Sequence, residues 1–161
     1  MKKLVSFALC AALLVTLLTG CIPDSREFTC QDLTMEVPLL MKDVSSDSAY
    51  SSFAFALDSS EVAIFGIKEE FSIISGGADM STMDYAKTVI EVNGHDSLAI
   101  SRSNEDYVYF TFEANLEAGL FKYVAGCYKG SDAFWMVQFG GPAKNFELET
   151  YLGYLDTVTL S

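Results

Sequence analysis

The order of apolar and polar positions predicts that the first part of the folded chain is made of strands. Residues 28–30 and 33–37 each alternate apolar with polar side chains, which is typical of an early strand pair. Residues 50–57 and 61–67 are rich in apolar side chains, and the short polar turn between them predicts a hairpin. We expect residues 71–74 to extend the second strand of that hairpin.

A run of further strands occupies the second half of the chain. The pattern predicts strands at residues 97–102, 107–116, 120–128 and 134–139, separated by short turns, and a short final strand within 157–160. Strands joined by such short turns must pair antiparallel.

Two helices complete the set of predicted elements. Ser81 and Asp84 have the spacing of a capping box, and Gly94 suits a left-handed cap after a helix that ends near Asn93. A second helix follows Pro142, a residue that favours the first turn of a helix. The expected buried face of this helix is Phe146, Leu148, Tyr151, Leu152 and Leu155.

Together these elements predict an α+β fold, an antiparallel β-sheet of about six to seven strands packed with two main helices. The 161 residues are enough for one domain with one sizeable core.

The first 21 residues have the layout of an export signal. Lys2 and Lys3 precede an apolar run at residues 4–18, and small residues then lead to a cysteine. The end of the run, Leu18-Thr19-Gly20-Cys21, resembles the lipobox of bacterial lipoproteins. This resemblance implies that Cys21 receives a diacylglycerol and becomes the new N-terminus, so that the protein is an extracytoplasmic, membrane-anchored lipoprotein.

Other outcomes for this segment stay open, namely a retained membrane helix, which needs about 20 apolar residues, or a signal that is cut and lost. The lipoprotein interpretation divides the chain into a signal peptide at 1–20, a tether at 21–27 and a single globular domain at 28–161. The membrane is then a partner through the N-terminal lipid.

Charge excludes one class of partner. The net charge is −12, and losing Lys2 and Lys3 with the signal takes it to −14. A strongly acidic protein is repelled by the phosphate backbone, so we expect no nucleic acid partner.

Two cysteines remain in the predicted domain, Cys30 and Cys127. Outside the cytoplasm they can form a disulfide that closes a long loop, or they can stay as two separate thiols. The sequence leaves both alternatives open, because it does not show whether the two positions are neighbours.

Aromatic residues on the predicted strands offer a candidate partner-binding patch. Tyr107 and Tyr109 share one face of their strand, and Phe134 and Met136 share one face of theirs. If these four side chains are left uncovered, they form a surface for a protein, peptide or glycan; if helices cover both sheet faces, they belong to the core.

The sequence singles out no catalytic residue, no metal site and no cofactor. His95 is the one histidine, so a site with several His ligands is excluded, and its place after a helix suits a charge–dipole contact. The neighbouring carboxylates Glu69 and Glu70 are typical of a solvated turn. We therefore favour a non-catalytic binding or accessory protein; the alternative is an envelope hydrolase whose carboxylates the sequence does not identify.

The order of elements is similar to that of the PsbP/Mog1-like α/β/α sandwich group, which includes many small bacterial lipoproteins. The residues that carry this resemblance are 28–38, Asp84-Tyr85-Ala86, Tyr107-Val108-Tyr109, 133–139 and 154–158. The resemblance implies a sheet covered by helices, and a protein that binds or assists other proteins.

The anchor hypothesis generates a first prediction. Cys21→Ser removes the thiol that would accept the diacylglycerol, so the precursor should accumulate uncleaved. Mass spectrometry of the membrane fraction measures this, and normal cleavage of the variant would show that the segment is not a lipobox.

Overall fold

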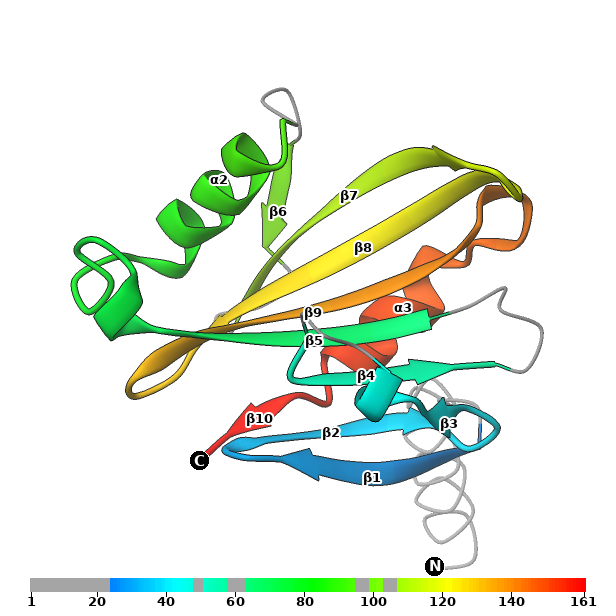
Figure 1. The fold of residues 1–161 in the computed structure, drawn as a ribbon, viewed down its shortest axis with the longest axis horizontal. Coiled ribbons are helices and arrows are strands. Elements are labelled where there is room, and N and C mark those ends of the chain that lie inside the picture. The colour runs from blue at the N-terminus through cyan, green and yellow to red at the C-terminus, as the bar shows by residue number, and fades with distance from the viewer. Residues whose placement is uncertain (1–23, 48–50, 58–62, 95–98, 103–106) are drawn as a thin grey trace, which may run out of the picture.

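The computed structural model describes residues 24–47, 51–57, 63–94, 99–102 and 107–161. In this part of the chain the main element is a seven-stranded antiparallel sheet with the order β3-β4-β5-β9-β8-β7-β6 (Figure 1). Its strands are β3 (Lys42–Asp43), β4 (Phe53–Ala56), β5 (Ala63–Glu70), β6 (Ile100–Arg102), β7 (Tyr107–Leu116), β8 (Gly119–Lys129) and β9 (Ala133–Pro142).

A second, smaller sheet consists of β1 (Ser25–Cys30), β2 (Leu33–Pro38) and β10 (Thr159–Leu160), in the order β1-β2-β10. Gln31, with φ 56°, occupies the tight turn between the first two strands. Ser25 already pairs with Pro38, so residues 25–27 belong to a strand, and the tether boundary predicted at residue 27 is wrong. The last strand joins β2 across more than 120 residues of sequence, a pairing that local pattern does not reveal.

The two predicted helices are present as α2 (Thr82–Val92) and α3 (Leu148–Leu155). The Ser81 hydroxyl accepts a hydrogen bond from the Asp84 amide at 3.1 Å, and Gly94 has φ 73°, so both predicted caps are confirmed. Three short 3-10 helices, η1 (Ser45–Asp47), η2 (Phe71–Ile73) and η3 (Ala143–Asn145), lie in connections.

The structure places η2 where the sequence predicted an extension of a strand. The ladder between β5 and β9 ends at the pair Glu70–Ala133. Beyond that pair the Phe71 amide donates to the Asp132 carbonyl, and the chain then turns. No neighbouring strand continues alongside residues 71–74 in the described part, so the backbone satisfies its hydrogen bonds locally instead.

Two apolar cores lie on opposite faces of the large sheet, which gives a three-layer arrangement. On one face α2 packs through Tyr85, Ala86 and Ile90. On the other face α3 and the small sheet pack together against Trp135, Val137 and Phe139. Figure 1 shows α2 on the far side of the large sheet from β1 and β2. The predicted α+β class is confirmed, with the difference that the strands divide into two sheets.

Gly66 on β5 lets the Phe53 ring on the neighbouring strand β4 pack directly against its backbone, and this close contact gives a second prediction. A Cβ on Gly66 would lie 2.0 Å from the Phe53 ring, which is itself buried between the layers. Gly66→Ala should therefore lower the free energy of unfolding by about 1–3 kcal/mol, as overpacking does. Gly130→Ala is the matched control, because its nearest neighbours would be at 3.3 Å or more. Urea unfolding measures both, and equal stabilities would contradict the predicted overlap at Gly66.

Candidate functional site

The site that the structure offers is a groove between α2 and the open part of the large sheet. Two adjoining hollows of about 250 and 90 Å³ share Val89, Asn93 and Met136 in their walls. We call this pair the α2 groove. Its remaining lining is Ile67, Glu69, Ile74, Tyr85, Thr88, Val92, Phe110, Phe112 and Gln138.

The groove exists because α2 covers only part of the sheet face beneath it. Tyr85 stacks on Phe134 with ring centroids 4.3 Å apart and planes 4° apart, which fixes the helix over one side of the sheet. Further along this face Phe112 and Tyr123 stack with ring centroids 4.8 Å apart, and both side chains remain half-buried. A half-buried apolar floor therefore continues beyond the edge of α2.

One carboxylate lies in this apolar setting. Tyr85 donates its hydroxyl hydrogen to Glu69 Oε2 at 2.5 Å. Burial, and then the hydrogen bond to Glu69, raise the pKa of Tyr85 far above its ordinary value, so this phenol remains a donor. Glu69 is the single charged residue in the described lining of the groove. Its side chain is half-buried, whereas the neighbouring Glu70 is exposed and accepts a hydrogen bond from Ser72, so the two carboxylates do not act as a pair.

The four residues of the predicted patch do not form one surface. Tyr107 and Phe134 are buried, at 2% and 0% exposure, and they belong to the cores on opposite faces of the sheet. Tyr109 packs beside Tyr107, and only Met136 lines the α2 groove. The prediction of a single open patch is wrong, because other elements pack against both faces of the sheet. Of the four side chains, only Met136 lines an open groove.

The structure also separates the two cysteines. Cys30 packs near the small sheet and its thiol points to the Ser52 carbonyl, with sulfur and oxygen 3.8 Å apart. Cys127 is fully buried beneath α2 on the opposite face. Both are free thiols, which corresponds to the alternative of two separate thiols that the sequence had left open beside a disulfide. Burial, with a smaller effect of Glu69, raises the pKa of Cys127 to about 12, which leaves it an unreactive thiol.

Other predicted sites lie elsewhere. Cys21 and His95 are outside the described residues. Within the described ranges no three His, Cys, Asp or Glu side chains come together as metal ligands.

The sequence did not identify Val89, Thr88 and Asn93 as groove residues. The signal that could have identified them is the breadth of the apolar face of α2. This face extends to Val92, whose side chain is 80% exposed and so is not covered by the sheet.

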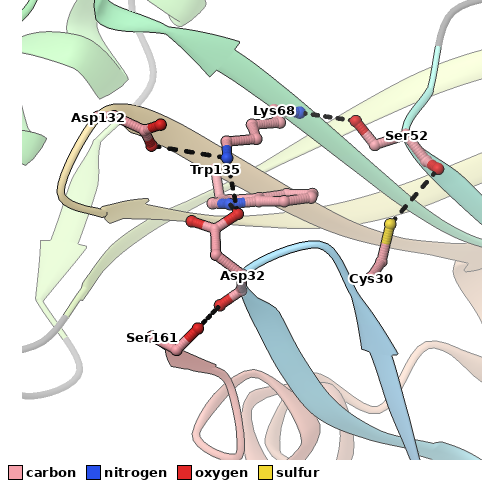
Figure 2. A network of polar contacts seen from close by, with 7 residues as sticks. All are labelled: Cys30, Asp32, Ser52, Lys68, Asp132, Trp135 and Ser161. Atoms are coloured by element: carbon pink, nitrogen blue, oxygen red, sulfur yellow. Dashed lines mark hydrogen bonds and ion pairs between the residues drawn. The ribbon is translucent and has the colours of Figure 1, made fainter.

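A second polar cluster joins the small sheet to the large one, as Figure 2 shows. Lys68 on β5 places its Nζ 2.7 Å from Asp32 Oδ1 in the turn between β1 and β2, and 3.5 Å from Asp132 Oδ1. The Trp135 indole N–H donates to the same Asp32 oxygen at 3.3 Å. The backbone amide of Ser161 donates to the Asp32 carbonyl, so the end of the described chain is held at this point as well.

This cluster, the Asp32 tie, has the properties of a structural link. The Lys68 and Asp32 side chains are only 15% and 17% exposed. Burial raises the pKa of Asp32, but the hydrogen bonds from Lys68, its own backbone and Trp135 outweigh that effect and hold the pKa below its ordinary value. The hydrogen bond to Asp32 raises the pKa of Lys68 despite the opposing effect of burial. Both groups are thus held in their charged forms, as an ion pair that fixes the two sheets relative to each other.

Solved structures show what the fold is similar to. The chain aligns with a protein from Bacteroides thetaiotaomicron VPI-5482 at a TM-score of 0.57 and 12% identity, covering 87% of this chain and 49% of that one. It aligns with cyanobacterial PsbP (CyanoP) from Synechocystis sp. PCC 6803 at a TM-score of 0.53 and 12% identity, covering 89% of this chain and 96% of that one. The chain therefore spans about half the length of the Bacteroides protein.

At this identity the likeness concerns the fold alone, and it supports the predicted resemblance to PsbP. No family model matches the sequence, and neither does any curated protein. Among the described helices, none combines the length and the apolar composition that a membrane span requires.

The Asp32 tie generates a third prediction, about pH. Because the folded pKa of Asp32 is below its unfolded value of about 3.9, its contribution to stability is present above that pH and is lost as pH falls through the folded pKa. Because the pKa of Lys68 is raised, its contribution is present below about 10.4 and is lost as pH rises through the folded pKa.

Lys68→Met should therefore lower the free energy of unfolding at pH 7 by about 1–2 kcal/mol, between the values of exposed and buried pairs. It should also flatten the loss of stability that we expect of the wild type as pH falls below about 3.9 and Asp32 becomes protonated. Lys87→Met is the control, since its pair with Asp84 at 3.0 Å is more than half exposed and should contribute little. Urea unfolding across this pH range measures the difference, and parallel pH profiles for wild type and Lys68→Met would contradict the link.

Proposed function

We propose that this chain is a lipid-anchored, extracytoplasmic binding or accessory protein that carries out no catalysis and holds a protein partner in the α2 groove. The observation that supports the proposal most directly is the composition of the groove. Its walls are apolar apart from a few polar side chains and one carboxylate, which is the usual make-up of a binding site.

The surroundings of the groove favour a protein partner over a small ligand. Val92 at its edge and Ile73 in the neighbouring η2 are 80% and 73% exposed, so apolar surface continues outside the hollows. A protein can cover this wider surface as well as fill the groove, whereas a small molecule would leave it in water.

The groove also favours a particular chemistry in the partner. Glu69 keeps one carboxylate oxygen beyond the one that Tyr85 occupies, and the chain as a whole is strongly acidic. A partner that places a Lys or Arg side chain among apolar residues would match both features, because the cation pairs with Glu69 while its aliphatic stem lies on Met136 and Val89.

A fourth prediction tests this role. The full lipoprotein carrying p-benzoylphenylalanine in place of Val92 should photo-crosslink to a defined envelope protein in its host, and the same label in place of exposed Lys144 should not. Glu69→Gln keeps the shape of the side chain and removes its charge, so the crosslink yield should fall about tenfold if the pairing is worth about 1.4 kcal/mol.

Glu70→Gln is the matched control, because it removes the adjacent carboxylate outside the groove. Equal yields from positions 92 and 144 would contradict a binding role for the groove. If position 92 crosslinks and neither Glu69→Gln nor Glu70→Gln changes the yield, the groove still binds a partner, but the proposed contact between Glu69 and a cation is contradicted.

A further inference from the structure

Two exposed leucines form the turn that follows β2. Leu39 and Leu40 are 52% and 82% exposed, the latter the highest among the large apolar side chains of the described residues. Their backbone is nevertheless fixed. The Met41 amide donates to the Pro38 carbonyl at 3.0 Å, and the buried Met41 side chain holds the far end of the turn in the core.

This turn lies beside the place where the described chain begins. The Leu39 amide donates to the Asp24 carbonyl at 2.9 Å, so these two backbone segments are in direct contact. Arg26 reinforces the arrangement by donating from Nη2 to the Met41 carbonyl at 3.0 Å. Asp24 is three residues from Cys21, and three residues span at most about 11 Å. If Cys21 carries lipid, the acyl chains are attached no more than about 11 Å of chain from Asp24, the residue whose carbonyl the Leu39 amide contacts.

We propose that Leu39 and Leu40 insert into the interfacial region of the bilayer, next to the lipid on Cys21, and so fix how the domain sits on the membrane. The proposal rests on the anchor put forward above. A bilayer is the occupant that fits, because the anchor brings it to this turn continuously, and apolar side chains added to an acyl chain strengthen membrane attachment.

The insertion has a consequence for the α2 groove. The small sheet carries the leucine turn, and α2 lies on the opposite face of the large sheet from the small sheet (Figure 1). A domain seated on Leu39 and Leu40 therefore presents α2 away from the bilayer, where a partner can reach it.

The chain contains its own control for apolar exposure. Leu116 and Leu120 flank the turn between β7 and β8, at 48% and 44% exposure, whereas the contact with the Asp24 carbonyl is made by the Leu39 turn. A difference between the two turns would thus come from position on the molecule.

The test uses tryptophan quenching by brominated phospholipids. The full acylated protein with Leu40→Trp or with Leu120→Trp is reconstituted in vesicles of phosphatidylcholine and phosphatidylglycerol, in which one lipid carries bromine. Native Trp135 is buried and provides the same background in both variants. We expect Leu40→Trp to lose at least half of its added emission and Leu120→Trp to lose none; the second variant also controls for the preference of tryptophan for interfaces.

Mass spectrometry of the same samples separates the two proposals. If the protein is acylated and the added emission falls equally at positions 40 and 120, the leucine insertion is overturned but the lipid anchor is not. The same result is expected if the turn at Leu39 and Leu40 contacts another protein instead of the bilayer. A processed chain without lipid at Cys21 would overturn both.

Discussion

The constraint on which the structure depends is that β9 is apolar on both of its faces. Trp135, Val137 and Phe139 alternate with Phe134 and Met136, and the strand pairs with β5 on one side and β8 on the other. Such a strand is stable only if both faces are covered, because either face alone would expose large aromatic side chains to water. The three layers of the domain follow from this requirement.

The covering elements are shorter than the strands, and this difference creates the groove. An 11-residue helix such as α2 is about 16 Å long, whereas the 11 residues of β8 extend over about 36 Å. On the other face the eight-residue α3 is shorter still, but the small sheet covers the remainder there. The α2 side has no second element of that kind in the described chain, so Phe112, Tyr123 and Met136 remain half-buried.

The sequence predicted most elements, because strands and capped helices have local signals. The strand at residues 107–116 has the predicted bounds, and Ser81 and Gly94 define α2 as expected. Non-local features could not be predicted. Alternation shows that Tyr107 and Phe134 each face one side of the sheet, but not that both sides are covered or that the two face opposite ways. The pairing of β2 with β10 joins residues far apart in the chain, and the separation of Cys30 from Cys127 depends on which face of the large sheet each one packs against.

The Asp32 tie fixes the orientation of the small sheet relative to the large sheet. β1 and β2 belong to a separate sheet, so without the Asp32 tie they would be held to the large sheet mainly by apolar packing, which specifies orientation less sharply than directional contacts do. Lys68, Trp135 and the Ser161 amide all converge on Asp32, and each comes from an element outside the hairpin it holds. Because Lys68 is next to Glu69 on β5, the strand that binds the hairpin on one face supplies the groove carboxylate on the other. If the domain is seated through its small sheet as we propose, this seating would also set the direction in which Glu69 faces, and the proposed partner would meet the groove in one orientation.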